Sequence, residues 1–271
     1  MFTRSQLERY SRQIVMSEVG ADGQRRLSDA SVLVVGAGGL GSPALLYLAG
    51  AGIGRLGVID SDAVDLSNLH RQILHTTADV GRQKVASARE RLAALNPDVV
   101  VEEHGLRLDS HNALELIGRF DMVLDGSDNF PTRYLVNDAC VIAGKPLVYG
   151  ALSRFEGQVG VLATGSAPCY RCLFPTPPPP GTVPSCAEAG VLGVLTGVVG
   201  SLMATEALRL ALGGFGVDGS STGLADSLML VDLLTPSFTA IDVSRDPDCP
   251  VCGDRPTITE LIDYQAFCGL G

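Results

Sequence analysis

The sequence predicts an α/β fold, in which a Rossmann-like, mostly parallel sheet is flanked by helices and followed by an antiparallel C-terminal extension. An apolar, β-branched run at Ser31–Val35 leads into a glycine-rich segment, Gly36–Gly41, and then into an apolar helical stretch, Pro43–Ala51. Apolar strand-like runs then alternate with helical stretches up to about residue 150, as in a chain of βα units. Beyond that residue lie two alternating strand-like segments and two Cys-x-x-Cys pairs, so the second half is expected to differ.

Composition and charge restrict the class of protein. The 271 residues are 46% hydrophobic, which allows a sizeable core in one large domain or two small ones. The formal net charge of -10 argues against a broad nucleic-acid-binding surface. The start has no secretion-signal pattern, and the apolar stretch Val191–Met203 is short of the ~18 residues of a membrane span. We therefore expect a cytoplasmic protein that does not enter a membrane.

The glycine-rich segment predicts a phosphate site. Glycine allows a tight turn and lets backbone N–H groups approach a phosphate, and the following helix N-terminus adds partial positive charge. The residues concerned are Gly36, Gly38, Gly39 and Gly41. An ordinary NAD-binding unit or a plain tight turn would also fit this segment, so the rest of the chain must identify the nucleotide.

A carboxylate follows at the distance typical of a ribose ligand. The second strand, Leu56–Asp60, ends 24 residues after Gly36. Asp60 is interpreted as the ribose-binding acid, although a turn at the strand end is the alternative. Asp62 and Asp65 lie nearby and are interpreted as loop carboxylates.

Two cations follow the predicted ribose acid. A polar segment, 65–72, contains Arg71, and a helix predicted from Asp79 to Leu95, with Asp79 as its cap, contains Lys84 in its early turns. Polyphosphates need such cations, because charge develops on a leaving pyrophosphate. The alternative is that both side chains are solvated surface residues.

Further strands and helices place one more carboxylate at the ligand edge of the sheet. Asp128 follows the strand Phe120–Leu124 and precedes the helix Phe130–Ala143. It is a candidate Mg²⁺ ligand, and capping of the helix is the alternative. The remaining predictions in this half are strands at Val99–Glu103, Leu147–Tyr149 and Val159–Leu162 and a short helix at His111–Ile117.

The two ends of the chain are predicted in less detail. Residues 3–30 are expected to form one or two short helices, and by spacing alone Arg12 is a solvated charge. Five of the six residues 175–180 are proline, which predicts a stiff surface loop. A helix, Ala187–Leu212, and an antiparallel strand pair, Ser227–Leu234 with Phe238–Val243, follow.

The cysteines predict a metal site. The two pairs, separated by 76 residues, are Cys169 with Cys172 and Cys249 with Cys252. Four thiolates complete a tetrahedral Zn²⁺ site with no open position, so the site is expected to be structural. Two independent redox pairs are the alternative. Cys140 is expected to be buried, whereas Cys186, at the end of the proline-rich loop, is expected to be accessible.

Together these segments resemble the MoeB/ThiF family of ubiquitin-activating-like adenylyltransferases. The proline-rich loop and Asp263–Gly269 are also similar to the TtuC-like subgroup, which serves tRNA thiolation in thermophilic bacteria. The matching segments are Arg9–Gln13, Gly36–Gly41, Ser67–Gln72, Gly81–Lys84, Asp125–Asn129, Gly157-Gln158, Cys186–Gly190 and both cysteine pairs. The resemblance implies a single adenylation domain, 1–271, with N-terminal helices (1–30), a nucleotide-binding half (31–150), a carrier-binding and zinc half (151–253) and a tail (254–271).

The implied reaction is an ATP-dependent adenylation. Its substrate would be the C-terminal glycine carboxylate of a small ubiquitin-like sulfur carrier that ends in Gly-Gly, of the MoaD, ThiS or TtuB type. The carboxylate attacks the α-phosphate, and pyrophosphate leaves with Mg²⁺. The product would serve sulfur transfer in molybdopterin, thiamine or thio-tRNA biosynthesis. The nucleophile is already ionised at neutral pH, so no general base is expected.

The resemblance also implies residue roles. Asp60 would bind the ribose, and Asp128 would bind Mg²⁺. The phosphates would be neutralised by Arg71, Lys84 and, from the other subunit of a homodimer, Arg12. The rest of the nucleotide site would comprise Gly36, Gly38, Gly39, Gly41, Asn68, Gln72 and Asn129. The paired cysteines would hold zinc. Cys186 would link covalently to the carrier or handle sulfur. Because no rhodanese-like domain is seen after residue 253, a separate donor, such as a cysteine desulfurase or a rhodanese, is expected to supply sulfur.

Three rival functions share part of the pattern. An NAD-dependent oxidoreductase explains the glycines and Asp60 but neither Arg71, Lys84 nor the cysteine pairs. A relative that modifies adenosine in tRNA shares the adenylation core, although the net charge of -10 opposes a tRNA-sized partner. An inactive scaffolding subunit would be expected to lack some of the phosphate-contacting residues that are present here.

Overall fold

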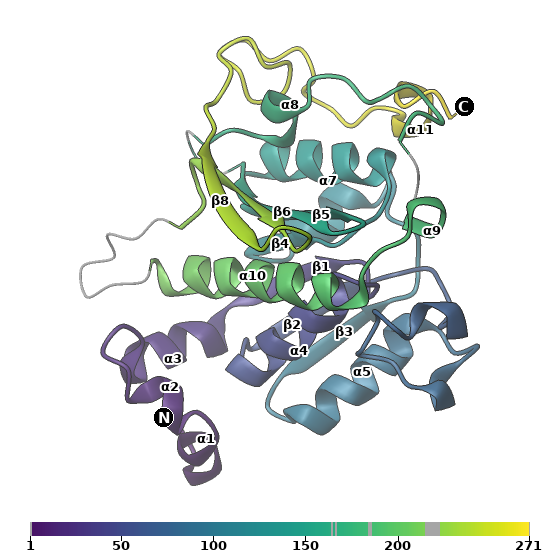
Figure 1. The fold of residues 1–271 in the computed structure, drawn as a ribbon. Coiled ribbons are helices and arrows are strands. Elements are labelled where there is room, and N and C mark those ends of the chain that lie inside the picture. Colours follow the sequence, from purple (N-terminus) through teal and green to yellow (C-terminus); the bar gives the residue numbers. More distant parts are fainter. Residues whose placement is uncertain (1, 164, 166, 184–185, 215–222, 271) are drawn as a thin grey trace.

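The computed structural model describes residues 2–163, 165, 167–183, 186–214 and 223–270. In this part of the chain an eight-stranded sheet lies between two layers of helices (Figure 1). The strand order is β3-β2-β1-β4-β5-β6-β7-β8. The predicted α/β fold with a mostly parallel sheet is confirmed.

The first five strands are parallel. Their order reverses direction between β1 and β4, which is the point at which Rossmann-type sheets open a ligand crevice. The strands are β1 (Ser31–Val35), β2 (Arg55–Ile59), β3 (Val100–His104), β4 (Met122–Asp125) and β5 (Leu147–Ser153). They agree with the predicted strands to within a few residues.

The last three strands continue the same sheet in antiparallel fashion. They are β6 (Glu156–Leu162), β7 (Ser227–Asp232) and β8 (Ser237–Asp242). The chain turns from β5 into β6 at Arg154, whose φ of 54° is in the left-handed region. The predicted antiparallel pair is therefore found, and it is part of one sheet with the nucleotide-binding half.

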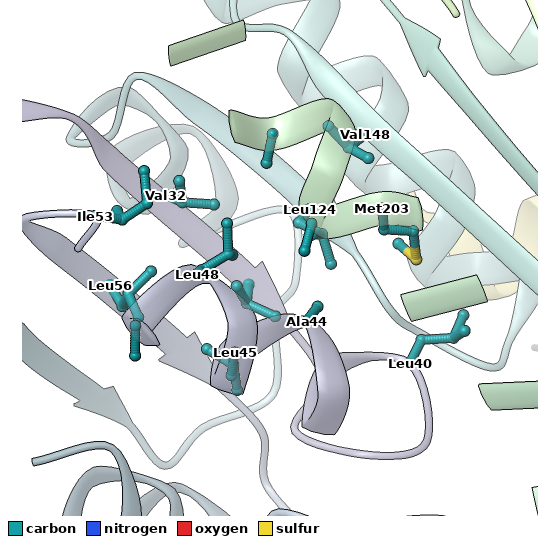
Figure 2. Packing of buried hydrophobic residues seen from close by; sticks show 14 of the residues in the cluster. Val32, Leu40, Ala44, Leu45, Leu48, Ile53, Leu56, Leu124, Val148 and Met203 are labelled. Carbon is teal, nitrogen blue, oxygen red and sulfur yellow. The ribbon is translucent and has the colours of Figure 1, made fainter. Parts of the chain in front are cut away.

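One face of the sheet is covered by four helices. They are α3 (Gly20–Asp29), α4 (Gly41–Ala51), α5 (Lys84–Leu95) and α10 (Gly193–Leu212). Figure 2 shows Leu45 and Leu48 of α4 close to strand residues such as Val32 and Leu56 in this core. The strand side chains reach it because alternate residues of a strand point to the same face.

The opposite face of the sheet carries a second core. Leu33 and Val123, the sequence neighbours of residues in the first core, point to this side, and Tyr149 joins them. The helices here are α6 (Ala113–Gly118), α7 (Phe130–Ala143) and α11 (Tyr264–Phe267). The tail, for which the sequence predicted no structure, thus returns to the sheet and contributes to its core.

A buried tyrosine joins the N-terminal helices to the end of α5. The short helices α1 (Arg4–Arg9) and α2 (Ser11–Ile14) precede α3, so residues 3–30 contain one helix more than expected. Tyr10 is 3% exposed, and its hydroxyl accepts a hydrogen bond from Asn96 Nδ2 at 2.8 Å. Asn96 also donates to the Ala49 carbonyl at 2.7 Å, which connects this region to α4.

The helix expected from Asp79 to Leu95 begins later than predicted. Residues Thr77–Asp79 form a single 3-10 turn (η2), and Asp79 caps that turn by accepting from Thr76. Gly81, with a φ of 87°, interrupts the chain before α5 begins at Lys84. The prediction of Asp79 as the cap of the long helix was therefore wrong, and Lys84 is the first residue of α5.

The helix expected at Ala187–Leu212 is divided in two. A short helix, α9 (Cys186–Ala189), is followed by Gly190, whose φ of 77° ends it, and α10 begins at Gly193. A Cβ at Gly193 would lie 2.4 Å from the His70 carbonyl oxygen, so this close approach requires glycine. In the described residues, α10 alone is long and apolar enough for a membrane span; since Val199 and Met203 are fully buried, we interpret it as a core helix.

Candidate active site

A cavity of about 380 Å³ opens at the carboxyl ends of the parallel strands. It lies beside the reversal between β1 and β4 and extends to the first residue of α5. The predicted nucleotide-site residues that line it are Gly36, Gly38, Gly39, Asp60, Arg71, Gln72, Lys84, Asp128 and Asn129. Residues separated by up to 93 positions in the sequence are thus brought to one place.

The glycine loop is too tight for other residues at two positions. Gly36 has a φ of 92°, and a Cβ there would lie 3.1 Å from the Gly126 carbonyl oxygen. A Cβ at Gly41 would lie 1.8 Å from the Gly36 carbonyl oxygen. Gly41 is not part of the cavity lining, so its observed contribution is to let the loop turn into α4.

Asp60 binds the backbone of this loop. Its Oδ2 accepts from the Ala37 N–H at 2.9 Å, and its Oδ1 accepts from the Asp62 N–H at 2.9 Å. The carboxylate therefore orders the glycine loop and the start of the next one. A contact with the ribose of a bound nucleotide stays a prediction.

Lys84 is buried and paired with two carboxylates. The residue is 5% exposed, and its Nζ lies 2.8 Å from Asp62 Oδ2 and 3.5 Å from Asp60 Oδ2. A buried ammonium is costly unless opposite charges and hydrogen bonds compensate it. The alternative that Lys84 is a solvated surface residue is wrong, and Asp62 is more than a loop carboxylate.

Arg71 is oriented by a neighbouring amide. Its Nη2 donates to Asn68 Oδ1 at 2.7 Å, and Thr196 of α10 donates through its hydroxyl to the Arg71 carbonyl at 3.1 Å. Asn68, in the 3-10 turn η1 (Leu66–Asn68), does not line the cavity but positions the guanidinium that does. Gln72 is buried, and within the described chain its Oε1 has no hydrogen-bond partner.

The two candidates after β4 have different structural roles. Asn129 caps α7, since its Oδ1 accepts from the Thr132 N–H at 3.0 Å. The alternative that Asp128 caps this helix is therefore wrong. Asp128 is exposed and lines the cavity, where a carboxylate is a suitable Mg²⁺ ligand.

Four further residues line the cavity although the sequence did not indicate them as site residues. They are Arg107, Ser127, Thr132 and Arg133. Arg133 lies one helical turn after the cap Asn129, so the Asp125–Asn129 motif could have indicated it. Arg107 comes from the loop after β3, in which no sequence pattern indicated a ligand.

His75 connects the glycine loop to α5, a role that the sequence did not predict. Its Nε2 lies 3.0 Å from the Ala37 carbonyl oxygen, and its Nδ1 lies 2.8 Å from Ser87 Oγ. A carbonyl only accepts, so Nε2 carries the proton, and in the neutral ring Nδ1 accepts from Ser87. Burial lowers the pKa of His75 and thereby favours this neutral form.

A second cavity, of about 570 Å³, adjoins the first. Its lining comes from β5, β6, β7 and β8, together with Phe130 of α7 and Tyr170 of the short helix α8 (Tyr170–Leu173). Arg133 and Leu152 line both cavities. The two spaces therefore meet at the first turn of α7.

The four paired cysteines converge as predicted. The sulfur atoms of Cys169, Cys172, Cys249 and Cys252 all lie within 4.8 Å of one another. The shortest separations are 3.4–3.9 Å, far longer than a disulfide bond and close to the spacing of about 3.8 Å in a tetrahedral Zn²⁺ site with bonds of ~2.3 Å. The arrangement fits a structural zinc site.

The zinc-site segment and the tail are linked by a buried ion pair. Arg171, between Cys169 and Cys172, donates to both oxygens of Asp138 on α7, through Nε at 2.8 Å and Nη2 at 2.8 Å. The Tyr264 hydroxyl of the tail donates to Asp138 Oδ2 at 2.8 Å. Both charged side chains are essentially inaccessible, so their mutual pairing is required.

Three further sequence predictions concern residues outside the cavity. Arg12 is exposed on α2 and lines neither of the two cavities described above. Cys140 is fully buried, as predicted. The side chain of Cys186 lies outside the described residues, so its accessibility stays a prediction.

Comparison with known proteins identifies relatives along the whole chain. The model of the ThiF family matches residues 10–251. The sulfur carrier protein adenylyltransferase of Thermus thermophilus is 58% identical, with 99% of both chains covered. The adenylyltransferase and sulfurtransferase MOCS3 of Anopheles gambiae is 52% identical over 98% of this chain, and the probable adenylyltransferase/sulfurtransferase MoeZ of Mycobacterium tuberculosis is 50% identical over 99%. This chain spans 59% and 66% of those two proteins.

Solved structures support the fold. The crystal structure of E. coli MccB with ATP matches with a TM-score of 0.78 at 24% sequence identity, covering 90% of this chain and 73% of that one. The complex of MccB with MccA-N7isoASN matches with a TM-score of 0.79 at 24% identity, covering 91% and 75%. At this identity the likeness concerns the arrangement of helices and strands.

Proposed function

The chain belongs to the ThiF family, and we propose that it adenylates the C-terminal glycine of a small ubiquitin-like sulfur carrier protein. The carrier would be of the MoaD, ThiS or TtuB type and end in Gly-Gly. The observation that carries the proposal is a single cavity that combines a glycine loop with Arg71, Lys84 and the exposed carboxylate of Asp128. This set suits ATP better than a dinucleotide, because two cations lie where a polyphosphate would extend.

The chemistry requires positioning and charge stabilisation. A carboxylate oxygen of the carrier attacks the α-phosphorus, one P–O bond forms, and the bond to the pyrophosphate oxygen breaks with its electron pair. Arg71 and Lys84 stabilise the charge on the departing pyrophosphate. The Asp60 and His75 contacts to the Ala37 peptide hold the loop against which the nucleotide would lie.

Two metal ions complete the proposal. Asp128 would hold Mg²⁺ against the phosphates, where the ion would neutralise developing charge. Zinc at the four cysteines would be structural, because four protein ligands leave no coordination position for a substrate.

The proposed reaction also implies several partners. The second cavity offers space for the carrier's C-terminal residues next to the nucleotide. Arg12 would contribute to the site of the other subunit in a homodimer, and Cys186 would link to the carrier or handle sulfur. A cysteine desulfurase or rhodanese would supply sulfur for molybdopterin, thiamine or thio-tRNA synthesis, and the protein would work in the cytoplasm.

Pyrophosphate exchange tests the proposed function directly. Purified protein is incubated with ATP, Mg²⁺, labelled pyrophosphate and a panel of the host's small proteins that end in Gly-Gly. We expect labelled ATP with at least one of them and none when its last two glycines are deleted. Preferential binding of NAD over ATP, or activity with tRNA instead of a carrier, would support a rival function.

A further inference from the structure

Arg133 lies at the boundary between the two cavities. Its side chain and that of Leu152 are the lining that the nucleotide cavity and the second cavity share among the described residues. Leu152 is apolar, so Arg133 is the charged group at this junction. In the proposed reaction, the carboxylate and the α-phosphate must meet where the two cavities join.

The guanidinium of Arg133 is held in place but incompletely paired. It lies over the rings of Phe130, at 5.6 Å, and Tyr149, at 5.9 Å from the ring centroids. Its Nη2 donates to the Ser127 carbonyl over a long 3.4 Å. Its Nε is buried, and nothing in the described chain accepts a hydrogen bond from it. The Tyr170 hydroxyl is a further polar neighbour, and the buried carboxylate of Asp125 attracts the guanidinium without reaching ion-pair distance.

Ser127 is the residue of the nucleotide cavity that lies beside Arg133. Asp125 holds it, because the Asp125 carboxylate accepts from the Ser127 N–H at 2.9 Å and also interacts with the Ser127 hydroxyl. Among the described residues, the unpartnered donor in this part of the wall is therefore the Nε of Arg133. Buried donors without partners are rare in folded proteins, so this position is suited to a ligand with acceptor oxygens.

We infer that Arg133 binds the C-terminal carboxylate of the incoming carrier and is a further catalytic residue of the adenylation. This inference rests on the proposed function. The planar guanidinium can hold the oxygen that does not attack, while the other oxygen faces the α-phosphorus. The O–P bond forms, the bond to pyrophosphate breaks with its electron pair, and Arg133 keeps all its protons.

A carboxylate fits this position better than a phosphate. Arg71 and Lys84 come from the loop after β2 and from α5, and Asp60 and Asp62 accompany Lys84 there. Arg133 instead belongs to α7 and faces the second cavity, through which the acyl group would arrive. It therefore serves the nucleophile, whereas Arg71 and Lys84 serve the leaving group.

The test is a cycle that combines a change in the enzyme with a change in the carrier. Binding is measured in the presence of α,β-methylene ATP, which cannot release pyrophosphate. The probe is the panel protein active in exchange, with its natural terminal carboxylate or with a terminal carboxamide. We expect the wild-type protein to bind the carboxamide about 10- to 100-fold more weakly, as for loss of one charged hydrogen-bonded contact. Arg133→Gln should bind both forms alike.

Two variants make the result specific. Arg133→Lys keeps the positive charge but lacks the paired N–H donors of the guanidinium, so it should show part of the preference for the carboxylate. This variant also tests the inference if Arg133→Gln does not fold. Arg55→Gln is the matched control, because Arg55 also lies over an aromatic ring, Phe120 at 4.4 Å, but lines neither cavity. It should keep the wild-type preference.

Two results would overturn the inference. One is a wild-type preference for the carboxylate in Arg133→Gln. The other is a loss confined to AMP and ATP binding, which would assign Arg133 to the α-phosphate. Absence of exchange by the wild-type protein with every Gly-Gly protein would contradict the proposed function itself, and the inference with it.

Discussion

Lys84 has a charge environment that only the folded chain supplies. Its ammonium lies between the carboxylates of Asp60 and Asp62 at the N-terminus of α5, where it is almost inaccessible. A helix N-terminus is an unusual place for a cation, since the partial charge there is also positive. The two carboxylates balance the positive charge of Lys84, and the negative charge of a bound polyphosphate would balance it further.

Lys84→Met should leave the fold intact and reduce pyrophosphate exchange by about 100-fold or more, because one donor to the leaving group is lost. Exchange kinetics measure this, with circular dichroism to verify folding. Lys145→Met is the control, because Lys145 does not line the cavity. Wild-type exchange in Lys84→Met would exclude the phosphate role.

His75 makes a contribution to stability that depends on pH. Burial lowers its pKa most; Lys84 lowers it too, whereas the Ala37 hydrogen bond, Asp79 and Asp60 raise it. As the pH falls below about 6.5, the unfolded chain takes up a proton that the folded protein resists, so the free energy of unfolding decreases. Above that pH both states are neutral, and the contribution is complete.

His75→Gln should therefore be less stable than wild type at pH 7.5, by about 1–3 kcal/mol for the lost hydrogen bonds. The difference should shrink as the pH falls to 5. Urea unfolding at a series of pH values measures it, and His111→Gln, an exposed residue, should follow the wild-type curve. A difference in the free energy of unfolding between the two proteins that does not change with pH would contradict the lowered pKa of His75.

At the scale of elements, the sequence predicted strands and long helices better than their beginnings. The bounds predicted for the helix Phe130–Ala143 are those of α7, although its cap is Asn129 and not Asp128. The start of α5 was missed because a 3-10 turn and the left-handed Gly81 precede it. The segment from Gly81 to Lys84 is held by backbone hydrogen bonds to Asp62 and Val64, which lie about twenty residues earlier in the chain. Arg133 follows the Asp125–Asn129 motif closely, but its position between two cavities could not be predicted, because the second cavity comes from strands far along the chain.

Loss of the metal from the four-cysteine site is expected to destabilise the protein. Metal analysis should find about one zinc per chain, as four thiolates require. Cys252→Ser should lose the metal and lower the melting temperature, since the site joins segments 80 residues apart. Cys140→Ala should keep its zinc. A metal-free protein with unchanged melting temperature would contradict the site.

The whole molecule combines one predicted sheet with sites assembled from distant segments. The parallel direction of β1 to β5 was predictable, because strands and helices alternate in this part of the sequence. The convergence of the cysteines was predictable, because two Cys-x-x-Cys pairs supply the four ligands of one Zn²⁺ ion. Arg12 is exposed on α2, as its spacing predicts, and it lies away from its own chain's cavity. Its proposed role therefore requires a second copy of the chain.

Subunit mixing tests that role. Arg12→Ala and Lys84→Ala homodimers should each be inactive in exchange. After random subunit exchange of an equal mixture, half the dimers are mixed and each has one intact site, so about one quarter of the wild-type activity should return. No recovery, with exchange confirmed by differently tagged subunits, would exclude a shared site.

Helix α7 connects the nucleotide cavity to the zinc-site segment. Asp138, which pairs with Arg171 of the zinc segment, and Asn129, which caps the helix at the nucleotide cavity, are nine residues apart, or about 14 Å along one rigid helix. Thermodynamic coupling between two sites is reciprocal. To whatever extent zinc strengthens ATP binding through α7, ATP must strengthen zinc binding by the same factor, so the working enzyme would also be the one that holds its metal most tightly.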